Sequence, residues 1–120
     1  PYFAEDELTD RSERFFVSEI IREKILLNYR QEIPYSVEVV VDSFRESEEM
    51  VRIEAMIYVN RDSQKAILIG KEGKAIKKAG TDARIDIEKF LNRKVFLELR
   101  VKVRKGWRDS DLQLKRFGYD

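Results

Sequence analysis

Three segments of this chain alternate between apolar and polar residues, and this pattern constrains the fold more than any other feature of the sequence. The clearest segment runs from Val51 to Val59, where Val, Ile or Ala occupies every second position. A period of two places these apolar side chains on one face of a β-strand. Segments 35–42 and 95–103 alternate in a similar way. We therefore expect a sheet with one buried face, which other elements must cover.

Only the short polar segment 45–49 separates the first two strands, so we expect an antiparallel hairpin. This segment lacks the Asn-Gly pair of the tightest hairpin turns. Periodicity alone fixes neither the direction of the third strand nor its place in the sheet.

A helix is expected before the hairpin, because apolar residues recur there at intervals of three and four. They are Phe15, Phe16, Ile20, Ile21, Ile25, Leu26, Leu27 and Tyr29. Asp10 followed by Glu13 is typical of a capping box at a helix start, and Pro34 is expected to end the helix. Residues 1–9 are acidic and lack periodicity, so we expect a linker or docking arm.

Two helices separated by glycines are expected between the second and third strands. The shorter covers residues 64–69, with Asp62 or Ser63 as its cap, and the longer follows the loop 70–73. Gly80 falls inside the longer helix, at a cost of about 1 kcal/mol relative to Ala. We attribute this glycine to close backbone packing, and a helix break at that point is the alternative.

The expected order is α-β-β-α-α-β, an α+β domain in which helices cover one face of a three-stranded sheet. In the tail, Asp109 or Ser110 could cap a final short helix that ends near Gly118. A chain of 120 residues is long enough for one domain with its own core. The chain begins at Pro1 rather than Met, so we expect it to be a piece of a longer protein.

The chain contains no His and no Cys, which excludes zinc fingers, disulfides and nucleophiles of either type. A metal site would need carboxylates alone, and neither a metal nor a cofactor is expected. Apolar runs reach only about five residues, whereas a membrane-spanning helix needs roughly 20. The absence of Cys fits the cytosol without establishing that location.

The formal net charge of +1 conceals a strong asymmetry. Residues 1–60 carry 7 Lys or Arg and 14 Asp or Glu, a net charge of −7, whereas residues 61–120 carry 17 and 9, a net charge of +8. A basic half of this size suggests a face that binds a polyanion. A dipolar surface that only aids solubility is the alternative.

The densest signal in the basic half is Gly70-Lys71-Glu72-Gly73, which lies between Ile69 and Ile76. Two glycines remove side chains where a sugar-phosphate backbone could approach, and the helix that follows directs free N–H groups toward phosphates. Several lysines surround the loop: Lys65, Lys71, Lys74, Lys77 and Lys78. The pattern favours a clamp for single-stranded RNA, which such loops hold over about four nucleotides. A tight connection between two helices is the structural alternative.

With this loop and element order, the sequence resembles type II KH domains, and in particular the C-terminal domain of the Era family of bacterial GTPases. The similarity extends over nearly all of the chain. Its motifs are Leu8-Thr9-Asp10-Arg11, Glu19-Ile20-Ile21-Arg22-Glu23, Pro34-Tyr35-Ser36, Arg61-Asp62-Ser63-Gln64-Lys65, Ile69-Gly70-Lys71, Lys94-Val95-Phe96-Leu97-Glu98-Leu99, Val101-Lys102-Val103 and Gly106-Trp107-Arg108.

The resemblance implies a mixed sheet, a KH domain over residues 10–120, and a linker at 1–9 from an N-terminal GTPase domain that lies outside this chain. It implies binding to single-stranded RNA near the 3′ end of small-subunit ribosomal RNA, during assembly of the small ribosomal subunit. A GTPase domain in cis is the further partner that it implies. A monomer in the cytoplasm is expected, with peripheral association at the inner face of the cell membrane as an option.

The resemblance assigns RNA binding to eight residues: Ile69, Gly70, Lys71, Glu72, Gly73, Lys74, Ile76 and Lys77. The glycines form the clamp, and the two residues between them are its variable middle. The isoleucines border a groove for bases, and the last two lysines lie near phosphates. The negative charge of Glu72 occupies a position where a second basic residue would help, which lowers the expected share of the loop in the affinity.

No Gly-x-x-x-x-Gly-Lys motif followed by Ser or Thr is present, because Gly73-Lys74 precedes Ala75 and lacks the upstream glycine. We therefore expect this chain neither to bind nor to hydrolyse GTP, and not to be an enzyme. The alternative function is a protein-interaction module, whose acidic N-terminal arm and first helix dock a GTPase domain or a ribosomal protein.

Three basic residues, Arg100, Lys102 and Arg104, share one face of the third strand. They either extend the basic surface toward a longer RNA or face solvent alone. Trp107 and Phe117 are expected to pack against the domain rather than to stack on bases.

Asp82 and Asp86 lie one helical turn apart and could be taken for a carboxylate pair. We expect a solvated face instead, with Lys78 and Lys89 nearby.

Overall fold

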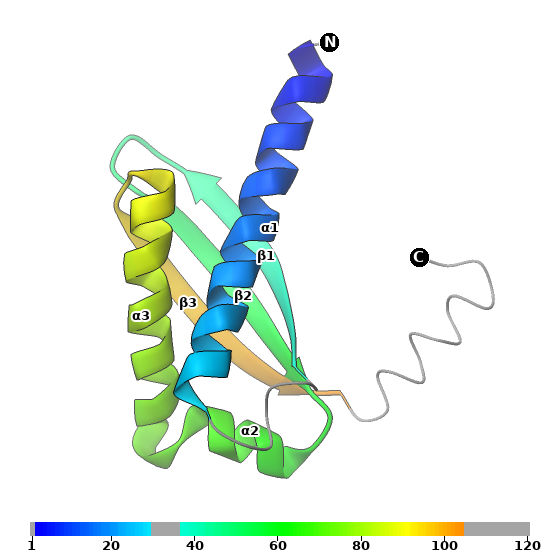
Figure 1. Cartoon of the computed structure of the whole chain (residues 1–120), viewed down its shortest axis with the longest axis vertical. Coiled ribbons are helices and arrows are strands. Elements are labelled where there is room, and N and C mark those ends of the chain that lie inside the picture. Colours follow the sequence, from blue (N-terminus) through cyan, green and yellow to red (C-terminus); the bar gives the residue numbers. More distant parts are fainter. Residues whose placement is uncertain (1, 30–36, 105–120) are drawn as a thin grey trace, which may run out of the picture.

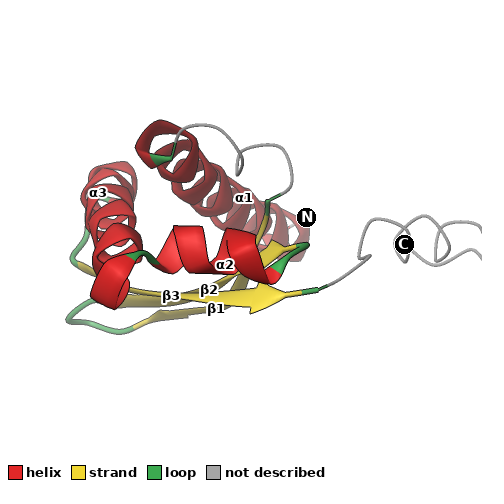
Figure 2. Ribbon diagram, turned by 90° about the horizontal axis from the view of Figure 1, so that it is seen from below, coloured by secondary structure: helices red, strands yellow, loops and turns green. Residues whose placement is uncertain are grey.

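The computed structural model describes residues 2–29 and 37–104, with side chains from residue 11 onward. Its elements are α1 (Tyr2–Asn28), β1 (Glu38–Glu46), β2 (Val51–Val59), α2 (Asp62–Ile69), the 3₁₀ turn η2 (Lys71–Gly73), α3 (Lys74–Leu91) and β3 (Val95–Val103). The helices form one layer and the strands the other (Figure 1 and Figure 2). The predicted α+β class and α-β-β-α-α-β order are confirmed.

The sheet is mixed, with the strand order β1-β2-β3. β1 pairs with β2 in the antiparallel sense, as the predicted hairpin requires, whereas β2 and β3 run parallel in continuous register from Val51↔Val95 to Val59↔Val103. A parallel neighbour requires a crossover connection. Here α2, η2 and α3 form that crossover, so the glycine loop lies in the middle of it.

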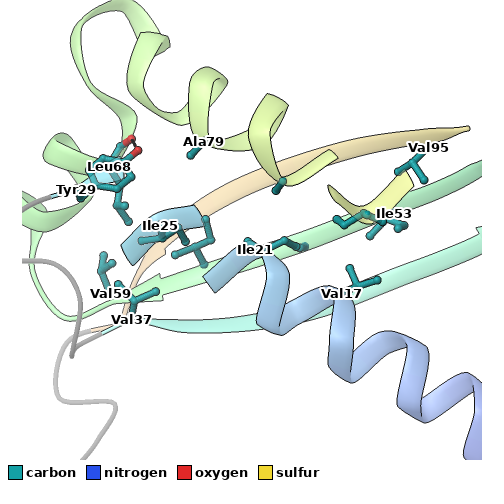
Figure 3. Close-up of a cluster of buried hydrophobic side chains, with 14 of the residues drawn as sticks. Val17, Ile21, Ile25, Tyr29, Val37, Ile53, Val59, Leu68, Ala79 and Val95 are labelled. Atoms are coloured by element: carbon teal, nitrogen blue, oxygen red, sulfur yellow. Dashed lines mark hydrogen bonds between the residues drawn. The ribbon is translucent and has the colours of Figure 1, made fainter. Parts of the chain in front are cut away.

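The core centres on β2, whose alternate residues are all buried as predicted: Val51, Ile53, Ala55, Ile57 and Val59. From α1, Val17, Ile21 and Ile25 pack on this face, and Figure 3 shows their side chains in one cluster with Ile53 and Val59. The other helices add Leu68, Ala79, Ala83 and Ile87. Burying one large aliphatic side chain stabilises the fold by about 1.5–3 kcal/mol, so this face holds the two layers together.

β1 contains an irregularity that the sequence pattern does not reveal. Its register against β2 shifts between Val41 and Ser43. Before the shift Val39 and Val41 pack on the core, and after it Phe44 does so. The strand continues to Glu46, so the polar turn is shorter than predicted. Tyr35, at the predicted start of this strand, lies outside the described residues.

α1 begins at Tyr2, so the predicted start at Asp10 is wrong and its capping box with Glu13 falls inside the helix. Figure 1 shows that the first turns extend beyond the sheet, where a helix needs no apolar stripe, which explains the lack of periodicity there. A linker role for residues 1–9 stays a prediction. The predicted stop at Pro34 lies outside the described residues.

The cap of α2 also differs from the prediction. The N-cap residue is Arg61, in extended conformation, and Asp62 and Ser63 lie in the first turn. The side-chain oxygen of Gln64 accepts hydrogen bonds from the backbone N–H groups of Asn60 and Arg61, at 3.0 Å each. A glutamine at the third helical position can reach back in this way, so no acidic or hydroxyl cap is needed.

α3 is continuous through Gly80, so the alternative of a helix break is wrong. A Cβ atom at Gly80 would lie 3.4 Å from Cδ1 of Leu99 on β3, which is ordinary contact. Helix and strand therefore do approach closely, although not so closely that only glycine fits. The predicted final helix and the aromatic residues Trp107 and Phe117 lie outside the described residues.

Candidate nucleic-acid interface

The backbone at Gly70 is held in a conformation that only glycine adopts readily, with φ 75° and ψ 179°. Its N–H donates to the carbonyl of Ala66 at 2.9 Å, which closes the end of α2. A Cβ atom at Gly70 would lie 2.5 Å from Cβ of Ala75. This glycine is therefore required by the tight passage from α2 to α3.

The second glycine has a different environment. Gly73 is left-handed, with φ 74° and ψ 11°, and follows the left-handed Glu72. A Cβ atom at Gly73 would have no atom within 4 Å. The loop is therefore open to solvent beside Gly73, which leaves room for a ligand backbone.

The N-terminus of α3 faces this open side of the chain. Its first turn contains no acidic residue, so no carboxylate of that turn offsets the positive end of the helix dipole. The N–H groups of Gly73 and Lys74 donate to the carbonyls of Gly70 and Lys71 within the loop, so an anion here meets mainly the positive end of the helix dipole. The loop and the start of α3 thus present a positive electrostatic end to a phosphate.

The lysines around the loop fall into two groups. Lys71, Lys74 and Lys77 are exposed, and although Lys74 lies 3.8 Å from Glu72, both side chains are more than 70% exposed. Such a pair contributes little and can reorganise around a ligand. Lys78 instead donates to Asp82 and to Asn28, each at 3.0 Å, and so links α3 to α1.

A groove of about 290 Å³ lies between α3 and β3. Its walls are Ile76, Lys77, Gly80, Thr81 and Arg84 from α3, and Leu97, Glu98 and Leu99 from β3. Ile76, Leu97 and Leu99 give the groove apolar surface, and its other side chains add cationic, hydroxyl and carboxylate groups. Flat bases can lie on such apolar surface while the polar groups contact their edges.

The structure brings the eight predicted residues together on α2, η2 and the first turn of α3. Ile76 and Lys77 also line the groove, whereas Ile69 is half-buried at the end of α2 and does not line it. Sequence reasoning missed the remaining groove residues, Gly80, Thr81, Arg84, Leu97, Glu98 and Leu99. The apolar face of β3 was the available signal, but its place opposite α3 depends on the parallel pairing.

Asp82 and Asp86 connect α3 to α1, and both remain partly exposed; Asp82 pairs with Lys78 as expected. Asp86 lies 2.6 Å from Nζ of Lys24, a residue of α1 rather than the expected Lys89. The hydrogen bond to Asp86 raises the pKa of Lys24. Hydrogen bonds from Lys78 and then Asn28 lower the pKa of Asp82. These contacts fix the orientation of the helix that begins at the glycine loop.

Tyr29 connects the end of α1 to α2. Its hydroxyl donates to the carbonyl of Leu68, and both side chains are buried. Burial raises the pKa of Tyr29 to about 12. The turn before the glycine loop is therefore anchored from α1 (Figure 3).

A second, larger groove of about 570 Å³ lies between α1 and α3. Phe16, Ile20, Leu26 and Phe90 line it, and the rings of Phe16 and Phe90 are 5.5 Å apart. Its charged residues are Glu19, Arg22 and Glu23. Because two of these three charged residues are carboxylates, this groove does not favour the binding of a polyanion.

Among the described residues, no group of acidic side chains is arranged to hold a metal ion. The helices within residues 2–29 and 37–104 include none that is both long and apolar enough to span a bilayer.

The model of the KH domain family matches residues 32–108, which is more than half of the chain. The chain belongs to the KH domain family. The matched region contains the hairpin, the glycine loop, both helices around that loop, and β3.

Comparison with curated relatives narrows the assignment to one kind of KH domain. It is 54% identical over 121 residues to the GTPase Era of Syntrophus aciditrophicus, and 49% identical over 119 residues to the GTPase Era of Coxiella burnetii. Each comparison covers 99% of this chain but only 40% of the relative. The domain therefore corresponds to the KH region of Era proteins, and it is not their GTPase domain.

Solved structures agree with this assignment. Crystal structures of Aquifex aeolicus Era bound to GDP and AlF4⁻, and of Era in complex with MgGDPNP and nucleotides 1506–1542 of 16S ribosomal RNA, each match with a TM-score of 0.78 at 38% identity. Each match covers 88% of this chain and 36% of the other. At this identity and similarity the comparison supports the same fold, with its mixed sheet and helix layer.

Proposed function

We propose that this KH domain binds single-stranded RNA, as the RNA-binding part of an Era-type GTPase that acts near the 3′ end of small-subunit ribosomal RNA in ribosome assembly. The observation that carries the proposal is the open glycine loop at the N-terminus of α3, next to the groove between α3 and β3. The Era structure in complex with 16S ribosomal RNA supports the class of ligand.

In this proposal the sugar-phosphate backbone lies over Gly73 and the first turn of α3, where no side chain blocks its approach. Lys71 and Lys74 contact phosphates through exposed, mobile ammonium groups. The bases turn away from the loop into the groove, where Ile76 and Leu99 contact their faces. Each part of a nucleotide thus meets a surface of suitable chemistry.

The test replaces the two middle residues of the loop in one variant, Lys71→Asp with Glu72→Asp. Aspartate tolerates the left-handed backbone at position 72, so the fold should remain intact. The control is Lys89→Asp, which makes the same change in net charge in the last turn of α3. Binding is measured by fluorescence anisotropy with the 3′ terminal segment of small-subunit ribosomal RNA, at several salt concentrations.

The loop variant should bind about ten-fold more weakly than the wild-type chain, and the salt dependence of its affinity should be smaller. The Lys89→Asp control should stay within about two-fold of the wild type. Equal affinity of the wild type and the loop variant at every salt concentration would contradict the proposal.

A second candidate function is protein docking through the groove between α1 and α3. The exposed Phe16 and Phe90 favour it, because aromatic residues are typical of protein interfaces. A GTPase domain in cis or a ribosomal protein would be the partner. The chemical shifts of backbone amides on titration with RNA separate the two candidates. Changes confined to α1 would favour protein docking, whereas changes at residues 70–84 would favour RNA binding.

For the longer protein we propose that residues 1–9 connect the KH domain to a GTPase domain, which binds and hydrolyses GTP. We also propose a monomer in the cytoplasm that associates peripherally with the inner face of the cell membrane. The identity to GTPase Era proteins, which are longer than this chain, supports the GTPase domain alone. Cell fractionation and light scattering of the full-length protein would test them.

A further inference from the structure

The face of the sheet opposite the helices carries no helix in the described part of the chain (Figure 2). Alternate residues of β2 and β3 point toward it, because their neighbours point into the core. On β3 these outer residues are Phe96, Glu98, Arg100 and Lys102, and Arg104 follows directly after the strand. Three of them are basic and one is acidic, so this strand presents a positive row.

Aromatic side chains lie directly beside these cations. The guanidinium carbon of Arg104 lies 4.4 Å from the ring centroid of Tyr58, and that of Arg52 lies 5.3 Å from the ring centroid of Phe96. Tyr58 also stands opposite Lys102 in the register of the two strands. Proteins that bind single strands combine a cationic track with aromatic rings and arginine planes of this kind, on which bases stack.

The outer row is continuous with the groove between α3 and β3. Glu98 lines that groove and also lies 3.1 Å from the guanidinium of Arg100 on the outer face. Within the described residues β3 pairs only with β2, so its other edge separates the groove from the outer face. RNA that leaves the groove and passes over the edge of β3 therefore meets Arg100 on the outer face.

We propose that the outer face of the sheet along β3, formed by Tyr58 of the neighbouring β2 with Arg100, Lys102 and Arg104, binds further nucleotides of the RNA strand that the glycine loop holds. This inference rests on the proposed function. A glycine loop of this type holds about four nucleotides, so a longer single strand extends beyond it and can reach a second surface. In the ion pair between Arg100 and Glu98 the guanidinium is 63% exposed and the carboxylate 39%, so a phosphate can reach Arg100 from solvent.

The test compares two lengths of RNA that share the same clamp segment, one of about 6 nucleotides and one of about 16. The outer-face variant is Arg100→Gln with Lys102→Gln. Its matched control is Lys89→Gln with Lys94→Gln, which makes the same change in net charge at exposed positions near the end of α3. The loop variant Lys71→Asp with Glu72→Asp completes the set.

The outer-face variant should bind the long RNA about ten-fold more weakly than the control, and the short RNA within about two-fold of it. For the long RNA, the slope of log affinity against log salt should fall by about 1.4, since each lost phosphate contact on a single strand removes roughly 0.7. The loop variant should weaken both RNAs.

Equal binding of the long RNA by the outer-face variant and its control overturns the inference, and so does an equal loss for both lengths. If the outer-face variant lost binding only to a protein partner, the inference would also fail, and the outer face would be a protein-binding surface. If the loop variant binds both RNAs normally while the outer-face variant fails on the long one, the proposed function fails and the outer face remains as an RNA surface.

Discussion

Gly70 faces Ala75 so closely that a Cβ atom at position 70 would lie 2.5 Å from the Cβ of Ala75. The variant Gly70→Ala should therefore suffer both a steric clash and a positive φ, and lose at least about 1–3 kcal/mol of unfolding free energy. Gly73→Ala should lose only about 1–2 kcal/mol, because its φ is unfavourable but its surroundings are open. Urea denaturation of the two variants measures the difference.

The two glycines differ in a second respect. Gly73→Ala places a methyl group on the open side of the loop, where the RNA backbone is proposed to lie. Its loss of binding free energy should therefore exceed its loss of unfolding free energy. Equal loss of stability in both variants would show that the tight contact with Ala75 relaxes and that glycine is needed at position 70 for its φ alone.

Gly80→Ala should raise stability by about 0.4–1 kcal/mol, because alanine is the better helix former and the new methyl group makes ordinary contact with Leu99. The same methyl group narrows the groove between α3 and β3, so RNA affinity should fall several-fold. Thermal unfolding and an RNA titration of one preparation check both expectations. A loss of stability would mean that Leu99 cannot adjust.

Tyr29→Phe should cost about 1–3 kcal/mol at neutral pH, because it removes the hydrogen bond to Leu68, whose carbonyl lies in the unpaired last turn of α2. Burial raises the pKa of Tyr29 from 10.0 to about 12, so the folded state favours the protonated phenol. That contribution is fully present below pH 10 and is lost as pH rises toward 12.

The stability difference between the wild type and Tyr29→Phe should therefore shrink between pH 10 and pH 12. Chemical denaturation at a series of pH values measures it, and the comparison cancels the titration of the other tyrosines and lysines. A difference that stays constant over this interval would mean that Tyr29 ionises normally in the folded protein.

Much of the fold follows from local pattern. The alternation in β2 predicts its buried face residue by residue, because a central strand covered on one side has a single way to bury Val51, Ile53 and Ile57. The glycine loop is equally visible, since few residues other than glycine tolerate the backbone at position 70. In β2 the burial of one face decides the structure, and at position 70 the positive φ decides it.

Other features depend on neighbours that the local sequence does not specify. The first turns of α1 extend beyond the sheet and need no apolar stripe, so their helix has no periodic signal. Gln64 caps α2 from inside the helix, where a side chain before the helix was expected. The groove combines Gly80 of α3 with Leu99 of β3, and only the parallel pairing of β3 brings the two together.

The parallel pairing of β3 also gives the domain an order of assembly during synthesis. A ribosome makes the chain from its N-terminus, so the glycine loop and α3 emerge before residues 95–103 do. Until β3 emerges and pairs with β2, the nascent chain has the loop but lacks one wall of the groove. An unfinished copy therefore has the glycine loop without the groove that we propose for the bases.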